Sequence, residues 1–166
     1  MSAPAVVDAL VVCLAAALRA REATLATAES CTGGMVAAAC TSLAGSSEWF
    51  ERGVVTYSNA AKSELLDVPA PLIAAHGAVS AEVARAMAAG VLARSPARFA
   101  VAVTGIAGPG GGAADKPVGL VHFAAASRAG NLTHAEKRYG DIGRSLVRHK
   151  SVLQALAMLR KMAEGQ

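Results

Sequence analysis

The sequence is poor in aromatic and charged residues. Phe, Trp and Tyr make up 4% of its 166 residues and Asp, Glu, Lys and Arg 17%, whereas apolar residues make up 54%. This apolar fraction excludes an intrinsically disordered chain. With so few aromatic residues, the core is expected to consist mainly of Ala, Val and Leu. The length predicts a single domain over residues 1–166.

The sequence also lacks a long hydrophobic run. The longest near its start, residues 9–18, is shorter than the roughly 20 residues of a membrane-spanning helix. Asp8 interrupts the approach to this run and no positive residue precedes it, which argues against a signal peptide. We therefore expect no membrane partner.

Cysteine is scarce and its spacing fits no metal site. The three cysteines are Cys13, Cys31 and Cys40. Cys13 and Cys40 lie in apolar helical patterns and are predicted to be small core residues. The odd number and the absence of metal spacing favour a reducing, cytoplasmic location.

Basic clusters are missing too. The net charge of +4 is modest, with no Lys/Arg run and no alternation of basic and aromatic residues. This pattern argues against a nucleic-acid partner. It is compatible with a small anionic ligand.

Helical and strand patterns alternate along the chain. Helices are predicted at 4–22, 33–45, 59–68, 79–95 (with Ser80 as N-cap) and 142–163, and strands at 24–30, 52–57, 98–105, 118–127 and 132–139. Pro69 and Pro71 are expected to end the third of these helices. The alternation, with one hairpin near the end, predicts an α/β fold: a three-layer α/β/α sandwich with a mixed, mostly parallel sheet.

The segment "ESCTGG" stands where the first strand gives way to a helix. Ligands bind at the carboxyl ends of strands in open α/β sheets, and Ser30 and Cys31 fall at such an end. The amides of Thr32, Gly33 and Gly34 would face a phosphate, carboxylate or oxyanion at the start of the helix. The alternative interpretation is a plain strand-to-helix turn in which Ser or Thr caps the helix.

The segment "TYSNAAK" offers partners for a serine nucleophile. The four histidines are scattered and form no triad pattern. Lys62 could act as the base if burial lowers its pKa from about 10.4, with Tyr57, predicted to close a strand, relaying a proton or orienting the amine. Alternatively, Lys62 is a solvated helix residue and Tyr57 a packing residue.

A glycine-rich loop follows the strand at 98–105, whose end carries Thr104. The loop, 106–117, is neither a Walker A sequence nor a dinucleotide fingerprint, since no GK[ST] follows and no helix opens after it. Its amides could surround a ligand. The alternative is a flexible surface loop, whose Lys116 faces an anion or nothing.

Two arginines lie four residues apart in "GDIGRSLVR". Arg144 and Arg148 share one face near the start of a predicted helix. Such a pair suits a phosphate or carboxylate. Surface ion pairing, for example with Asp141, is the alternative.

Taken together, these segments resemble a known family. "AESCTGG", "RGVVTYSNAAK", "HGAVSAEVA", "AVTGIAGPGGG" with "KPVGLV", and "GDIGRSLVR" follow one another as in the CinA carboxy-terminal domain family, over roughly residues 14–159. Its stand-alone members include the nicotinamide-nucleotide amidases of the PncC type. Many CinA proteins carry a larger amino-terminal domain, which this chain is expected to lack, and Arg52 stands where the family usually has Gly.

The resemblance implies an amidohydrolase that converts nicotinamide mononucleotide to nicotinic acid mononucleotide and ammonia, in pyridine nucleotide recycling. It implies a Ser30 nucleophile assisted by Lys62 and Tyr57, with no metal and no cofactor. The substrate-binding positions implied or considered above are Cys31, Thr32, Gly33, Gly34, Thr104, Gly105, Gly108, Gly110, Gly111, Arg144 and Arg148. Within this set, the amides of residues 31–34 would hold the oxyanion and the two arginines the phosphate.

Two alternatives remain open at this point. Cys31 could be the nucleophile, because a thiol at a helix N-terminus has a lowered pKa. The chain could also be a non-catalytic nucleotide-binding protein, an accessory in competence or stress, although binding alone does not need the set of Ser30, Tyr57 and Lys62. The Ala- and Leu-rich helices favour a homodimer.

Overall fold

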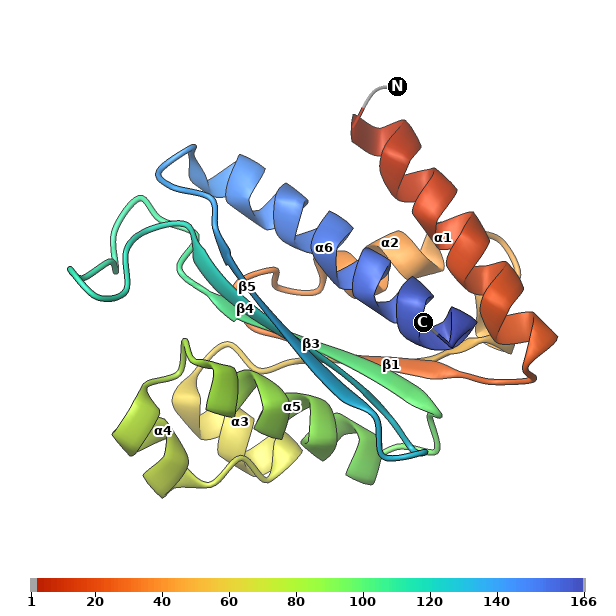
Figure 1. Ribbon diagram of the computed structural model, residues 1–166, viewed down its shortest axis with the longest axis horizontal. Coiled ribbons are helices and arrows are strands. Elements are labelled where there is room, and N and C mark those ends of the chain that lie inside the picture. The colour runs from red at the N-terminus through yellow and green to blue at the C-terminus, as the bar shows by residue number, and fades with distance from the viewer. Residues whose placement is uncertain (1–2, 166) are drawn as a thin grey trace.

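Five strands and six α-helices make up the structure. The computed structural model describes residues 3–165, so positions 1, 2 and 166 of the predicted domain lie outside the described residues. The elements (Figure 1) are α1 (Ala3–Ala20), β1 (Leu25–Glu29), α2 (Met35–Thr41), a short 3₁₀ turn η1 (Ser46–Glu48), β2 (Phe50–Val55), α3 (Asn59–Leu66), α4 (Ala70–His76), α5 (Ala81–Ala93), β3 (Phe99–Gly105), β4 (Leu120–Ser127), β5 (Leu132–Arg138) and α6 (Arg144–Glu164).

The strands form one mixed sheet in the order β2-β1-β3-β4-β5. β1 pairs in parallel with both β2 and β3, whereas β4 is antiparallel to both β3 and β5. Every strand except β4 therefore runs in the same direction, as predicted. The carboxyl ends of β2, β1 and β3 meet at one edge of the sheet.

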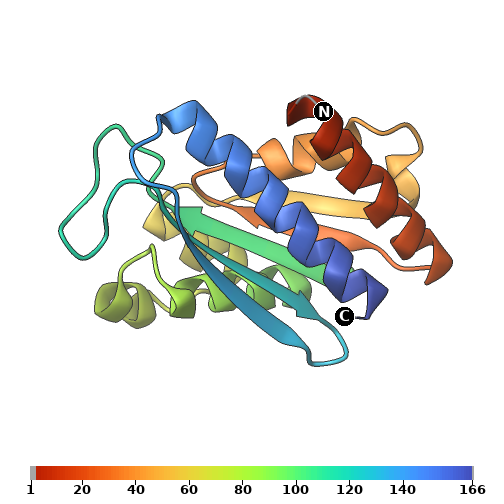
Figure 2. The same cartoon turned by 45° about the horizontal axis from the view of Figure 1, so that its top comes forward.

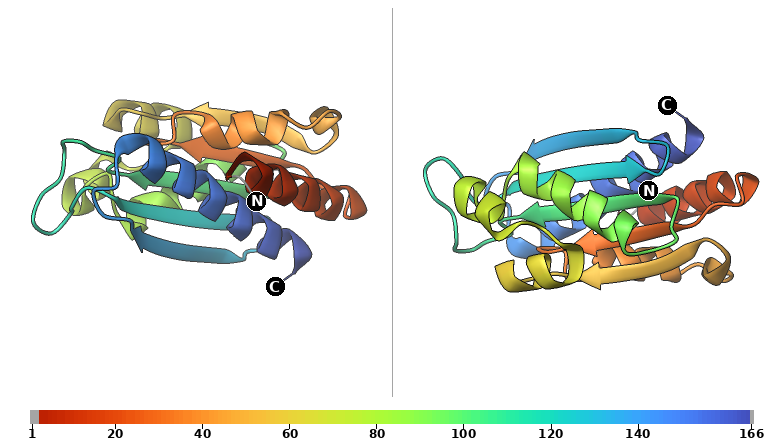
Figure 3. Two further views of the ribbon diagram at one scale, coloured as in Figure 1. Left: turned by 90° about the horizontal axis from the view of Figure 1, so that it is seen from above. Right: turned by 90° about the horizontal axis from the view of Figure 1, so that it is seen from below.

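Helices cover both faces of this sheet. α1, α2 and α6 lie on one face and α3, α4 and α5 on the other, and views from above and below the sheet separate the two layers (Figures 1 and 3). The chain's last helix, α6, runs diagonally across its face beside α1 (Figure 2). The predicted three-layer α/β/α arrangement is confirmed. Across residues 3–165, no helix combines the length and apolar character needed to cross a membrane.

The two faces of the sheet carry side chains of different size. Towards α1, α2 and α6 the buried strand residues include Leu25, Phe99, Val101, Val103, Val121 and Phe123. In the hydrophobic cluster towards α3–α5, the residues from the central strands are all alanine: Ala26, Ala28, Ala100, Ala102, Ala124 and Ala126. Because successive strand residues point to opposite faces, alternating large and small residues in the sequence produce this difference. The small side chains let the backbone of α5 lie close to the sheet.

Three local predictions were confirmed and two were wrong. Ser80 caps α5 by accepting a hydrogen bond from the Val83 amide at 3.3 Å, and Cys40 is buried. Cys13, however, is exposed on α1. β2 ends at Val55, so Tyr57 lies in the following loop rather than closing a strand. The helix α3 ends at Leu66, ahead of Pro69 and Pro71, as predicted.

The short helix α4 was not predicted. It begins at Ala70, with Pro71 in its first turn. Proline is tolerated there because the first amides of a helix have no intrahelical partner.

Close packing of α5 against α3 predicts the effect of one substitution. A Cβ at Gly90 would lie 2.0 Å from the carbonyl oxygen of Leu66. Gly90→Ala should therefore lower the free energy of unfolding by about 1–3 kcal/mol through overpacking, despite alanine's higher helix propensity.

Chemical denaturation measures this change. Ala89→Gly, at the exposed neighbouring position, is the control and should cost only about 0.5–1 kcal/mol. A Gly90→Ala protein as stable as the wild type would contradict the packing described here.

Candidate active site

Ser30 lies where the parallel strands end. It directly follows β1, and its amide donates to the Val103 carbonyl of β3 at 2.9 Å. On the other side, the Thr56 amide, which follows β2, donates to the Glu29 carbonyl at 2.8 Å. These two bonds extend the parallel pairing past the strand ends. They fix Ser30 between its neighbours, at the edge where open α/β sheets bind ligands.

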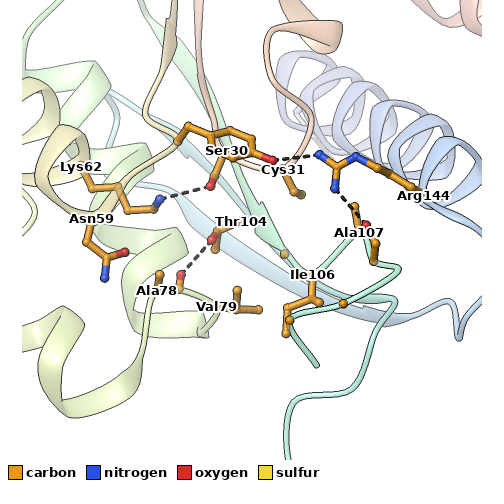
Figure 4. A pocket seen from close by; sticks show the side chains of 15 residues that line it. Ser30, Cys31, Asn59, Lys62, Ala78, Val79, Thr104, Ile106, Ala107 and Arg144 are labelled. Atoms are coloured by element: carbon orange, nitrogen blue, oxygen red, sulfur yellow. Dashed lines mark hydrogen bonds between the residues drawn. The ribbon is translucent and has the colours of Figure 1, made fainter. Parts of the chain in front are cut away.

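A cleft of about 270 Å³ opens at this edge (Figure 4). Its walls come from the ends of β1 and β3, the segment after β2, the loop before α5, the glycine-rich loop and the start of α6. The lining residues are Ser30, Cys31, Tyr57, Asn59, Lys62, Ala78, Val79, Thr104, Gly105, Ile106, Ala107, Gly108, Gly110, Gly111 and Arg144. Most of the predicted site residues are thus brought together, whereas Thr32, Gly33, Gly34 and Arg148 lie outside the lining.

Lys62 meets Ser30 inside this cleft. The lysine Nζ lies 3.1 Å from Ser30 Oγ and donates to the carbonyl of Thr56 at 2.8 Å (Figure 4). The first turn of α3, capped by the Ser58 hydroxyl, carries the lysine side chain back towards β1. Lys62 is therefore not the solvated helix residue of the alternative interpretation, because its exposed fraction is 1%.

The electrostatic surroundings of Lys62 favour its neutral form. The lysine takes part in no salt bridge among residues 3–165. Burial lowers the pKa of Lys62 from the ordinary value of 10.5, and the nearby Cys31 sulfur opposes this shift only in part. Desolvation penalises the ammonium form. An uncharged amine within hydrogen-bonding distance of a hydroxyl is a general base for that hydroxyl.

Tyr57 contacts Arg144 rather than Lys62. Arg144, the first residue of α6, donates from its guanidinium to the Tyr57 hydroxyl at 2.8 Å and to the Gly108 carbonyl at 3.0 Å. The tyrosine side chain is 59% exposed. A direct proton relay from Tyr57 to Lys62 has no hydrogen bond to support it among the described residues. Arg144 instead joins the segment after β2 to the glycine-rich loop across the mouth of the cleft.

The Cys31 thiol has the opposite character from the one that the alternative of a cysteine nucleophile requires. Its side chain is buried, and desolvation raises the pKa of Cys31 from 9.0 to about 12, although the charges of Arg148 and Lys62 act in the other direction. Such a thiol stays protonated at neutral pH. The thiolate is the nucleophilic form, so this result argues against Cys31 as the nucleophile.

The amides of the turn after Ser30 are not all free for a ligand. The buried carboxylate of Glu29 accepts from the amides of Gly34 and Val36, each at 3.0 Å, and from Ala37 at 2.9 Å. The Gly33 amide donates to the Ser30 carbonyl at 3.0 Å.

Gly33 and Gly34 were predicted to present their amides to a ligand, but these amides are used within the protein. The positive φ angles of the two glycines, 59° and 95°, are those that the turn itself requires. Among the described residues, only the Cys31 and Thr32 amides of this turn lack an acceptor.

Arg148 also departs from its predicted role. Its guanidinium donates to the carbonyls of Cys31 and Thr32 at 3.1 and 3.0 Å, and it does not line the cleft. Residues four apart on a helix lie one turn apart along its axis. Because of this offset, Arg144 reaches the mouth of the cleft while Arg148 reaches the turn behind Ser30. The expected pair of phosphate ligands is thus reduced to Arg144.

The far wall of the cleft is fastened by two further contacts. Thr104 donates its hydroxyl to the Ala78 carbonyl at 2.8 Å (Figure 4). Lys116, at the end of the glycine-rich loop, donates to the His76 carbonyl rather than facing an anion. The first bond ties the segment between α4 and α5 to the end of β3, and the second ties the end of α4 to the loop after β3. Thr104 was predicted to bind substrate. It lines the cleft, but its hydroxyl donates to Ala78 and so holds the wall in place.

Sequence reasoning missed several lining residues. Asn59 begins α3 and faces the cleft, but its type and place were equally those of a helix cap (Figure 4). Ala78 and Val79 were missed because α4, which delivers them, was not predicted. The apolar Ile106 and Ala107 carry no chemical signal. Arg52, in contrast, lies away from the cleft and contacts Glu51 and the Arg94 carbonyl. The departure from the family at position 52 therefore leaves the cleft unchanged.

No metal centre is apparent in the part of the chain that the structure describes. Within residues 3–165, no three His, Cys, Asp or Glu side chains gather closely enough to hold an ion. His122 and His134 form a pair, with Nδ1 and Nε2 3.0 Å apart, on the strands β4 and β5. Neither histidine lines the cleft.

The sequence and the fold of this chain are similar to those of known proteins. The chain is 54% identical to a CinA-like protein of Synechococcus sp. (strain RCC307) over 86% of its own length, but spans only 34% of that protein. It is 51% identical to the nicotinamide-nucleotide amidohydrolase PncC of Escherichia coli (strain K12), over 86% of both chains.

A solved structure gives the same result. The competence/damage inducible protein CihA from Agrobacterium tumefaciens superimposes with a TM-score of 0.93 at 50% identity, covering 97% of this chain and 96% of that one. Residues 7–163 match the family described as the CinA C-terminal domain. This match and the full-length relatives show that the chain belongs to the CinA C-terminal domain family.

Proposed function

We propose that this chain is an amidohydrolase that converts nicotinamide mononucleotide and water to nicotinic acid mononucleotide and ammonia. The observation that carries the proposal is the contact between Ser30 and a buried Lys62 that forms no salt bridge with a carboxylate among residues 3–165. A protein that only binds nucleotides has no need of such a lysine. The similarity to the PncC amidohydrolase supports the substrate class.

In the first half of the reaction, neutral Lys62 takes the proton of the Ser30 hydroxyl as Oγ attacks the carboxamide carbon. The Cys31 amide, directly after the nucleophile, donates to the oxyanion that forms. The lysine ammonium then protonates the amide nitrogen, the C–N bond breaks and ammonia leaves. The Thr56 carbonyl accepts from Lys62 and orients the amine towards Ser30.

The second half repeats these steps with water. Lys62, neutral again, takes a proton from water as it attacks the ester carbon on Ser30. Breakdown of the second tetrahedral intermediate returns the proton to Ser30 Oγ and releases the carboxylic acid. All proton transfers involve groups of this chain, the substrate and the attacking water. We place the reaction in the cytoplasm, where free cysteines such as these three stay reduced.

Arg144 is proposed to bind the substrate phosphate. It lies at the mouth of the cleft, and its Nε donates to no acceptor within residues 3–165. Guanidinium and phosphate form strong charge-assisted hydrogen bonds. In this proposal, the Tyr57 hydroxyl holds the guanidinium in place, so the tyrosine assists binding rather than proton transfer.

Nucleophile substitutions test the reaction directly. Ammonia release from nicotinamide mononucleotide, measured with EDTA present, should fall by about a thousandfold or more in Ser30→Ala, since the covalent step is lost. It should remain within about tenfold of the wild type in Cys31→Ser. No ammonia from the folded wild type would instead indicate the non-catalytic nucleotide-binding protein, and loss of activity only in Cys31→Ser would assign the nucleophile to the thiol.

The lowered pKa of Lys62 predicts a pH dependence. The protonated amine cannot accept a proton, so kcat/KM should rise with pH as Lys62 loses its charge, through a single ionisation below 10.5. Lys62→Arg should be inactive at every pH tested, because a guanidinium stays protonated. A pH–rate profile of Cys31→Ser is the control and should keep this ionisation, moved to lower pH because the Cys31 sulfur raises the pKa of Lys62. Disappearance of the ionisation in that variant would mean that the thiol is the titrating group.

Arg144 should distinguish nucleotide from nucleoside. Arg144→Gln removes a charged donor, worth about 1.5–3 kcal/mol, and should raise KM for nicotinamide mononucleotide by about ten- to a hundredfold. KM for nicotinamide riboside should change by about twofold or less. Lys137→Gln on the exposed face of β5 removes the same charge as a control. Equal effects of Arg144→Gln on both substrates would rule out phosphate binding by this arginine.

A further inference from the structure

The guanidinium of Arg148 binds backbone carbonyls rather than an acidic side chain. Within residues 3–165, it donates two hydrogen bonds, both to backbone carbonyls of the turn after Ser30: Nε to Cys31 at 3.1 Å and Nη2 to Thr32 at 3.0 Å. No salt bridge involves this arginine within residues 3–165. Its side chain is half-buried between α6 and the turn. An arginine used in this way fixes backbone orientation rather than pairing with an acid.

Peptide geometry carries this orientation to the donor beside the nucleophile. In a planar trans peptide, the C=O and the following N–H point in opposite directions. Fixing the Thr32 carbonyl therefore fixes the Gly33 N–H, which donates to the Ser30 carbonyl at 3.0 Å. The Ser30 carbonyl shares its peptide plane with the Cys31 N–H. Two linked planes thus connect Arg148 to the amide expected to hold the oxyanion.

The other side of the turn is held independently. Glu29 accepts from the amides of Gly34, Val36 and Ala37, which anchors the start of α2. Arg148 holds the carbonyls of the preceding residues, and Gly33 provides the space, because a Cβ there would lie 3.3 Å from Arg148 Nη2. The carboxylate and the guanidinium together leave little freedom to the peptide units between Ser30 and Gly34.

We propose that Arg148 is a positioning residue of the amidase, which orients the turn after Ser30 so that the Cys31 amide faces the oxyanion. The inference rests on the proposed function and differs from the phosphate role suggested by the sequence. Arginine is required because its two donors lie in a rigid plane and reach two successive carbonyls, which the single ammonium of lysine cannot do in the same geometry.

Kinetics of Arg148→Gln test this role. Losing one oxyanion donor costs an enzyme about 10²–10³ in kcat, so a misaligned donor should lower kcat by about 10- to 100-fold. KM for nicotinamide mononucleotide and for nicotinamide riboside should both stay within about threefold, since no substrate contact is lost. Arg148→Lys, which keeps the charge and one donor, should recover part of kcat. Lys161→Gln, at an exposed site in the last turn of α6, controls for the lost charge.

Two kinetic outcomes would overturn the proposal. A KM that rises for the mononucleotide but not for the riboside would make Arg148 a phosphate ligand. A kcat equal to that of the wild type and of Lys161→Gln would show that the turn keeps its geometry without the arginine.

Amide hydrogen exchange provides a readout that does not need activity. In Arg148→Gln, the Gly33 amide should exchange at least about tenfold faster, because the Thr32 carbonyl, which shares a peptide plane with this amide, is no longer held in place. The Val101 amide in the centre of the sheet is the internal reference for global stability. Unchanged exchange at Gly33 in the folded variant would overturn the inference. If the wild type releases no ammonia, the proposed function fails, and exchange at Gly33 still decides whether Arg148 orients the turn.

Discussion

The buried carboxylate of Glu29 is the interaction on which the candidate site depends. It ends the central strand of the parallel part of the sheet and accepts three amides from the start of α2. Those amides would otherwise be unpaired in the interior, at a cost of about 1–3 kcal/mol each. A single side chain thus determines how strand and helix meet. Ser30, the next residue, acquires its position from this junction.

Lys62 contrasts with Glu29 although both are buried at the same end of the sheet. Hydrogen-bond donors surround the carboxylate, whereas the amine has a carbonyl and a hydroxyl but no acid nearby. Burial therefore favours the uncharged lysine. The difference suits the proposed chemistry, in which Glu29 stays a fixed structural group while Lys62 gains and loses a proton in each half of the reaction.

The sequence was sufficient to predict the layers, the direction of most strands and the convergence of Ser30, Lys62 and Thr104 at one edge. These features follow from hydrophobic periodicity and from the rule that parallel strands end together. The contact partners were not predictable. Whether the second arginine of α6 points to a ligand or to a backbone carbonyl depends on the depth at which the helix packs, and periodicity does not report this depth.

Glu29 illustrates the same limit more clearly. A glutamate at the end of a strand carries no local signal that it will cap the following helix, since its partners lie five to eight residues further on. The helix α4 was missed for a different reason, because proline was interpreted as a helix breaker at a position where it begins one. For Glu29, the deciding groups are backbone amides, which nearly every residue carries, so the sequence does not show which of them the carboxylate will bind. For Pro71, the deciding factor is its place in the first turn of a helix, where a missing N–H leaves no hydrogen bond unmade.

The contacts of α6 have a consequence for how the site comes into being. Its first two turns hold the mouth of the cleft through Arg144 and the turn behind Ser30 through Arg148, yet the residues they meet are 36 to 117 positions earlier in the chain. During synthesis, Ser30 and Lys62 are therefore made well before the helix that completes the site. A nascent chain halted after β5 would carry Ser30 and Lys62 without either arginine. On this view, the site can be completed only after α6 has been made and has packed on the sheet.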